Sequence, residues 1–210
     1  MISLSEILHT IAQALMIPCL IILIILMAGA VWQIGDIVVE YIAERRKHKC
    51  NVPQLLRDVH AAGADGLAEL IENSGLLRRQ KKALLELAES RGLPKDTLTA
   101  LAERLLATEE ARNARTTSIT DMIAKLGPMF GLLGTLIPLG PGIVALGQGD
   151  TVTLSESMNV AFDTTIAGVI SAAVASVISH IRKRRYNDDM VSLETLMEAV
   201  LEEVTSDVEG

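Results

Sequence analysis

A single aspartate interrupts an otherwise uncharged stretch of the chain, and a second polar side chain lies close to it. Asp163 is the only Asp, Glu, Lys or Arg in residues 157–181, and Asn159 precedes it by four positions, on the same face of a helix. In a membrane-spanning helix such a carboxylate costs roughly 2.5–3.5 kcal/mol near the centre and marks a functional site by default. The alternative is an aspartate near the outer end that stays wet or accepts a hydrogen bond from a neighbouring hydroxyl.

Small and hydroxyl residues recur at helical spacing in this stretch and in residues 126–149, which carry no charge at all. Small side chains permit close helix contact in lipid, where hydrophobicity does not drive helices together. We therefore predict two stripes that face each other or a shared lumen. They are Thr164, Gly168, Ala172 and Ser176 in the later stretch, and Gly127, Gly131 and Thr135, with Gly134 beside them, in the earlier one.

The glycines and prolines of residues 127–150 allow three interpretations. A phosphate-binding loop needs GxxxxGK followed by Ser or Thr, but the nearest lysine, Lys125, precedes the glycines. A solvated linker is more polar than this segment. A close-packed membrane helix remains, with Pro128 in its first turn and with Pro138 and Pro141 predicted to kink its outer half.

A third uncharged stretch, residues 10–35, is the most apolar of all. As a helix it would extend about 39 Å, beyond the hydrocarbon core of about 30 Å. A cleaved signal peptide would need a basic segment ahead of it, and residues 1–9 hold no Lys or Arg. We expect a retained membrane helix.

The basic residues predict the orientation of these spans. All 19 Lys and Arg lie within 45–125 or 182–185, and such residues gather on the cytoplasmic side. We therefore predict an all-α membrane protein with three transmembrane helices, N-out and C-in, with a helical cytoplasmic region between spans 1 and 2. Its parts are an outside N-terminal segment with helix 1 (1–35), the cytoplasmic region (36–126), helix 2 (127–147), an outside loop (148–156), helix 3 (157–181) and a cytoplasmic tail helix (182–210).

The remaining composition argues against several classes of function. The net charge is −7, and basic residues do not alternate with aromatic ones, so nucleic-acid binding is not expected. No Cys or His spacing suggests a metal or cofactor, and no nucleophile elbow or carboxylate pair beside a histidine suggests an enzyme. The cytoplasmic helices are expected to form a solvated bundle. A long helix from Lys95, which continues into span 2, is predicted to carry an apolar stripe of Leu98, Leu101, Leu105, Ile119, Met122 and Leu126.

Two segments, "GPMFGLLGT" and "AFDTTIAGVISAAVAS", resemble the last two spans of the MotA/TolQ/ExbB proton-channel family. The order of one early span, a long cytoplasmic helical region and two closely connected spans is also similar, and the ExbB/TolQ-like members are nearer than the MotA-like ones. The resemblance implies a homopentamer in the inner (plasma) membrane, around a pore that holds an ExbD/TolR/MotB-like single-span partner with a membrane aspartate. It favours H⁺ as the ion.

In such a channel hydroxyl groups line the proton path, and the resemblance places them at Thr135 and Thr164. A hydroxyl suits this role because it both donates and accepts a hydrogen bond. ExbB-like members often carry a glutamate at the position of Asn159. In this chain either Asp163 takes over the role of that glutamate, or the role is absent. The predicted function is that of a proton-channel subunit that couples proton flow to movement of its partner, for energy transduction or transport. The alternative is a non-conducting oligomeric scaffold, in which the same small residues only pack helices.

Overall fold

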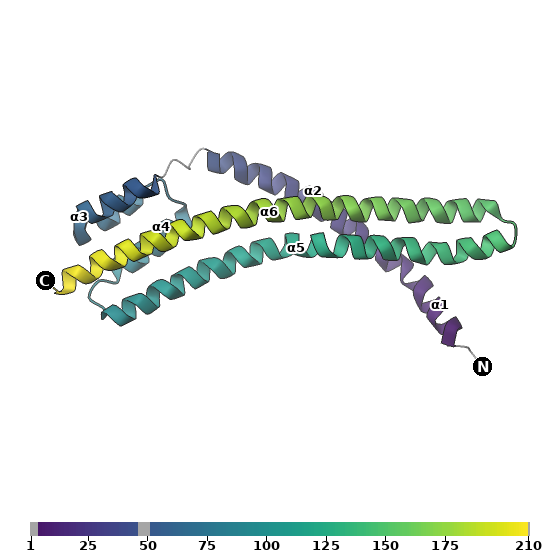
Figure 1. Cartoon of the computed structure of the whole chain (residues 1–210), viewed down its shortest axis with the longest axis horizontal. Helices are drawn as coiled ribbons and strands as arrows, with labels where there is room; N and C mark the ends of the chain where they lie inside the picture. The colour runs from purple at the N-terminus through teal and green to yellow at the C-terminus, as the bar shows by residue number, and fades with distance from the viewer. Residues whose placement is uncertain (1–3, 46–50, 210) are drawn as a thin grey trace. The chain divides into compact units, whose positions relative to one another are not determined.

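The computed structural model describes residues 4–45 and 51–209, and the regular secondary structure in these ranges is α-helical (Figure 1). Three stretches of the described chain are long and apolar enough to cross a membrane: Glu6–Val39, Lys95–Gly147 and Thr151–Ser206. The predicted all-α class is therefore confirmed, with three stretches able to span a membrane. The helices are α1 (Leu4–Ala14), α2 (Met16–Arg45), α3 (Val52–Asn73), α4 (Arg78–Glu89), α5 (Lys95–Gly147) and α6 (Thr151–Glu209).

The chain divides into two compact units. The apolar unit consists of Met1–Val38 and Thr117–Ile181, and the polar unit of Val39–Thr116 and Arg182–Gly210. Eighteen of the 19 Lys and Arg belong to the polar unit, and Lys125 is the exception. The boundary between the two compact units thus coincides with the boundary between the basic and the uncharged parts of the sequence.

The polar unit is a bundle of α3, α4, the beginning of α5 and the end of α6. Its fully buried residues come from all four segments: Val59, Leu67, Ile71, Leu84, Leu87, Leu98, Leu193, Leu196, Met197, Val200 and Val204. Gly63 bends α3 with a φ of 63°, in the left-handed region that glycine adopts readily. Gly92, with a φ of 89°, lies in the turn between α4 and α5, and α5 begins directly after Pro94.

The first predicted span is two helices rather than one. α1 ends at Ala14 and α2 begins at Met16. Pro18 has no N–H to donate to the carbonyl of Ala14, four residues earlier, so the helical hydrogen bonding is interrupted there.

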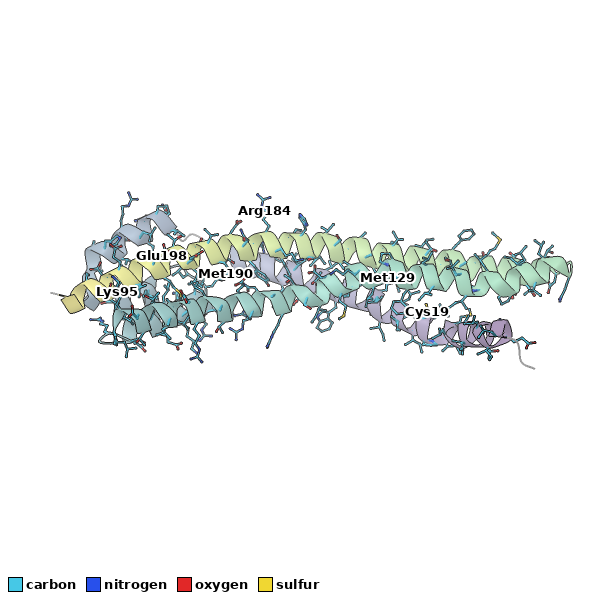
Figure 2. The ribbon with its side chains drawn as sticks, turned by 60° about the horizontal axis from the view of Figure 1, so that its bottom comes forward. Cys19, Lys95, Met129, Arg184, Met190 and Glu198 are labelled. Carbon is cyan, nitrogen blue, oxygen red and sulfur yellow. The ribbon has the colours of Figure 1, made fainter. Side chains whose placement is uncertain are left out.

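The buried positions of α2 recur with a period of seven residues. Cys19, Leu23, Leu26, Ala30 and Gln33 are buried, and their alternating spacing of four and three is the spacing of a coiled-coil seam. Leu26 and Ala30 pack in one cluster with Ile123 of α5 and Ala175 of α6. The Cys19 thiol donates to the carbonyl of Phe130, with 3.4 Å between Sγ and O; Figure 2 labels Cys19 and Met129, the neighbour of Phe130. Within the apolar unit α2 therefore runs antiparallel to α5.

α5 and α6 lie side by side in the apolar unit and touch through glycine backbones (Figure 1). A Cβ on Gly168 would lie 2.6 Å from the carbonyl oxygen of Gly127 and 2.9 Å from the Cα of Gly131. Real side chains do not approach so closely, so the contact requires glycine on both helices. We call these three residues the glycine contact. Ala172 belongs to the same face, since its Cβ would be 3.0 Å from a Cβ on Gly127.

The connection between α5 and α6 is shorter than predicted. Only Gln148–Asp150 are non-helical, and residues 151–156 of the predicted loop form the first turns of α6. Asp150 starts this helix: its Oδ1 accepts the backbone N–H groups of Val152 and Thr153, each at 3.1 Å, and its Oδ2 accepts the Thr153 hydroxyl at 2.6 Å. The predicted tail helix is likewise the continuation of α6.

We expect Asp150→Ala to lower the melting temperature of the detergent-solubilised protein, because the first turn of α6 loses its cap. The Thr153 hydroxyl, together with the N–H groups of Thr153 and Val152, lowers the pKa of Asp150. A carboxyl with a lowered folded pKa stabilises the fold fully above its unfolded pKa of about 3.9, and this contribution is lost as the pH falls through the folded value. The difference in melting temperature from wild type should therefore be largest near neutral pH and shrink below about pH 4.

The control is Asp150→Asn, because its side-chain oxygen can still accept hydrogen bonds from the two backbone N–H groups. A difference that stays constant down to pH 2 would contradict this role.

Candidate functional site

Thr164 lies inside the α5–α6 contact, where a glycine makes room for it. Its side chain is 5% exposed, and a Cβ on Gly134 would lie 2.6 Å from the Thr164 Cβ and 2.7 Å from its Oγ1. The hydroxyl donates to its own helix, 2.9 Å from the carbonyl oxygens of both Val160 and Ala161. Its oxygen keeps lone pairs that can accept a hydrogen bond from water or a proton donor.

Thr135 lies next to Gly134 on α5 and is half-buried. Its hydroxyl donates to the carbonyl of Leu132 at 2.7 Å. Gly134, the residue before Thr135, is the α5 position at which a Cβ would overlap the Thr164 side chain.

Asp163 and Asn159 are exposed on the surface of α6. Both point away from α5, because the neighbouring Thr164 occupies the buried side of the helix. Next to them around the helix lie apolar side chains, among which Phe162 is 58% and Ile166 56% exposed. The exposed surface of this part of α6 therefore has one apolar sector and one sector with a carboxylate and an amide.

Most of the predicted packing residues meet across the α5–α6 interface, but Ser176 does not. Gly127, Gly131, Gly134, Gly168 and Ala172 take part in the contacts above. Ser176 is exposed, and the buried serines on either side of it are Ser171 and Ser179. Four residues turn a helix by about 400°, so a stripe of period four drifts by about 40° per step. Over three steps the drift moves Ser176 off the buried face.

A second group of polar residues lies at the other end of the apolar unit, and sequence reasoning missed it. The Thr120 hydroxyl of α5 donates to Gln33 Oε1 of α2 at 2.6 Å, with side chains 0% and 6% exposed. The Ser179 hydroxyl of α6 donates to Oδ1 of Asp121 on α5 at 2.5 Å, and Ser179 is 5% exposed. We call Gln33, Thr120, Asp121 and Ser179 the polar layer. Each of the three spanning segments contributes to it.

The polar layer was missed because α5 was assigned the wrong inward face there. The predicted stripe included Ile119 and Met122, but these are 58% and 52% exposed, whereas Thr117 and Thr120 are buried. A helix in water buries its apolar side, while helices in lipid contact one another through small and polar residues. Gln33 within the apolar first span was the available signal.

No group of three or more His, Cys, Asp or Glu side chains in the described part of the chain is placed to hold a metal ion. Every buried side-chain nitrogen or oxygen there has a hydrogen-bond partner. The polar groups described above, Thr135, Thr164, Asn159, Asp163 and the polar layer, are hydroxyls, amides and carboxylates, a set suited to passing protons or holding water.

Three stretches able to span a membrane, with hydroxyls in their interfaces and a carboxylate on an exposed helix face, are the features of an integral membrane protein with polar groups between its helices. The model of the MotA/TolQ/ExbB proton channel family matches residues 70–195, more than half of the chain. The chain belongs to this family, which confirms the resemblance read from the sequence. A search of curated proteins found no match.

The fit between Gly134 and Thr164 can be tested by a double-mutant cycle. We expect Gly134→Ala to destabilise the protein by about 1–3 kcal/mol, the usual effect of overpacking, because the new methyl group overlaps Thr164. Thr164→Gly should remove much of this penalty, so the two changes should couple by about 1 kcal/mol or more. Unfolding in mixed micelles measures the coupling.

The matched control is Gly140→Ala, since no atom lies within 4 Å of a Cβ at that position of the same helix. This change should be tolerated and should show no coupling to Thr164→Gly. Equal effects of the two alanine substitutions would contradict the assigned contact.

Proposed function

We propose that the chain is a proton-channel subunit of an ion-driven membrane motor, which couples proton flow to movement of a single-span partner. Membership of the MotA/TolQ/ExbB family supports a proton-channel role in general. The proposal adds an ExbD/TolR/MotB-like partner with a membrane aspartate, an assembly of five copies, and H⁺ rather than Na⁺ as the ion. It assigns the chain no enzymatic reaction of its own.

One observation carries the proposal: Asp163 and Asn159 share an exposed face of a helix that is apolar enough to span the membrane. A carboxylate in a spanning helix faces a bundle interior or a water-filled cavity rather than lipid. Among the described residues of one chain no such interior covers Asp163, which is exposed, so other subunits supply it. A pore between copies, filled by water and a partner helix, satisfies this requirement.

The roles of the residues follow from their positions. Asp163 and Asn159 form the entry of the proton path on the pore side of α6, and Asp163 takes the place of the glutamate that similar proteins carry at the position of Asn159. Thr164 and Thr135 hold the water through which the proton passes, since each donates to a backbone carbonyl and still accepts.

The proposed orientation places the N-terminus and Gln148–Asp150 outside and the polar unit in the cytoplasm of a cell with this protein in its inner (plasma) membrane. The basis is the distribution of Lys and Arg, of which 18 lie in the polar unit. The positive-inside rule gives the same side for both parts of that unit.

A non-conducting scaffold is the second candidate, and the glycine contact is the observation in its favour. Gly127, Gly131 and Gly168 are accounted for by packing within one chain, so they need no ion path to explain them. The scaffold predicts stable assemblies that conduct no protons and need no partner with a membrane carboxylate.

Proton flux distinguishes the two candidates. The complex is purified from its native host through a tag on this chain, reconstituted into phospholipid vesicles, and subjected to a pH gradient with a pH-sensitive dye inside. We expect Thr164→Val to reduce flux by about 10²-fold or more, the typical contribution of a proton-transfer group, with assembly unchanged.

Thr165→Val is the matched control, because Thr165 is the next residue and its hydroxyl likewise donates to the carbonyl of Ala161, at 3.0 Å. It should conduct as the wild type does. Wild-type complexes that contain a single-span partner and pass no protons would favour the scaffold, and undiminished flux in Thr164→Val would remove Thr164 from the path.

A further inference from the structure

The first helix of the apolar unit, α1, has one apolar side and one polar side. Its large aliphatic residues, together with the residue directly after the helix, recur at helical spacing and form a single stripe: Leu4, Ile7, Leu8, Ile11 and Leu15. The polar residues occupy the rest of the circumference: Ser5, Glu6, His9, Thr10 and Gln13. α1 is therefore amphipathic, although it adjoins the most apolar span of the chain.

The apolar stripe of α1 has no cover within the described part of the chain. Its side chains are 44–75% exposed. Among the side chains that the structure describes, the first buried one is Cys19, which belongs to α2. Figure 1 shows α1 apart from the α5–α6 hairpin. A continuous apolar stripe is unfavourable in water, so something outside this part of the chain covers it.

The length of α2 places α1 outside the hydrocarbon core of a membrane. The uncharged part of α2, residues 16–35, extends about 30 Å, which is the thickness of the core. α2 alone is therefore long enough to cross, and α1 lies beyond its end. Since the helical hydrogen bonding is interrupted between the two helices, α1 can take a direction of its own. The core would also be unfavourable for the carboxylate of Glu6.

The charge of α1 indicates how it can bind a membrane surface. Residues 4–14 hold no Lys or Arg, and Glu6 is their only Asp or Glu. Helices that bind anionic lipids at the interface carry Lys and Arg on their polar side, so α1 lacks this attraction. Its contact with a membrane depends on the apolar stripe.

We propose that α1 lies in the plane of the membrane interface, at the end of the span where α2 begins. The apolar stripe contacts the acyl chains next to the headgroups, and the polar side faces water. Lipid is the partner, because the stripe is continuous along the chain with the exposed apolar surface of α2, where Ile17, Ile21 and Ile24 are 52–69% exposed. This placement goes beyond the proposed function and does not depend on proton conduction.

Tryptophan fluorescence of the full chain in phosphatidylcholine vesicles tests the placement. Trp32 is the single tryptophan of the chain and is first replaced by phenylalanine. Leu8→Trp then puts the reporter on the apolar stripe. We expect strong quenching by lipids with bromine near the headgroup end of the acyl chain, weaker quenching by lipids with bromine near the end of the chain, and little quenching by iodide in the buffer.

Two matched variants serve as references. Thr10→Trp carries the same reporter about 200° around the helix, so iodide should quench it and brominated lipids should have little effect. Ile25→Trp lies in the middle of the uncharged part of α2, at a position that is 62% exposed, and should be quenched most by the deeper bromine. Replacement of part of the phosphatidylcholine by phosphatidylglycerol should leave the quenching of Leu8→Trp unchanged.

Each of the other outcomes would overturn the placement. Iodide quenching of Leu8→Trp as strong as that of Thr10→Trp would put the stripe in water. A bromine profile equal to that of Ile25→Trp would make α1 part of the span, and protection from both quenchers would mean that protein covers the stripe. Stronger bromine quenching in phosphatidylglycerol would mean that headgroup charge holds the helix. None of these results bears on the proposed proton flux, which is measured separately.

Discussion

The apolar unit depends on the contact of two backbones at Gly127, Gly131 and Gly168. Lipid removes the hydrophobic advantage of bringing helices together, so dispersion between closely packed atoms must hold them. Glycine on both sides brings the helix axes near enough for many such atom pairs to form. A Cβ at Gly168 would stand 2.6 Å from a carbonyl oxygen, so even alanine requires the helices to move apart.

That short separation fixes where polar groups fit. On the hairpin side of the glycine contact, Thr164 fills the space left by Gly134. On the basic side, the same separation lets the short side chain of Ser179 reach Asp121. The glycines thus divide the interface into two polar regions, separated by a segment in which the two backbones are in contact.

The sequence was sufficient for the spans and for most of the close contact, because both depend on local pattern. Stretches without charge predict membrane helices, and glycines four residues apart predict the side on which helices touch. Period-four reasoning failed at Ser176, where the true period of 3.6 had accumulated enough rotation to expose the side chain. It also failed at Ile119 and Met122, where α5 changes from a helix that buries apolar residues to one that buries small and polar ones.

The polar layer was beyond sequence reasoning for a different reason. Gln33 and Thr120 are separated by 87 positions and Asp121 and Ser179 by 58, so no local spacing links either pair. Their meeting depends on how α2 crosses α5, which the seam of Cys19, Leu23, Leu26, Ala30 and Gln33 sets. The seam becomes visible only when the heptad spacing is sought within a continuous apolar run, where nearly every position is equally apolar.

Packing alone leaves one feature of the chain without a cause. A scaffold explains the glycines, the seam and the Gln33–Thr120 bond, because each of these joins helices of a single chain. It does not explain Asp163, which is exposed, forms no hydrogen bond or ion pair with a described residue, and carries an energetic penalty wherever lipid approaches it. The neighbouring Phe162 and Ile166 show that the same helix can present a purely apolar surface. A carboxylate kept one position away from that surface, beside a buried threonine, has a physical reason only where water and ions reach it.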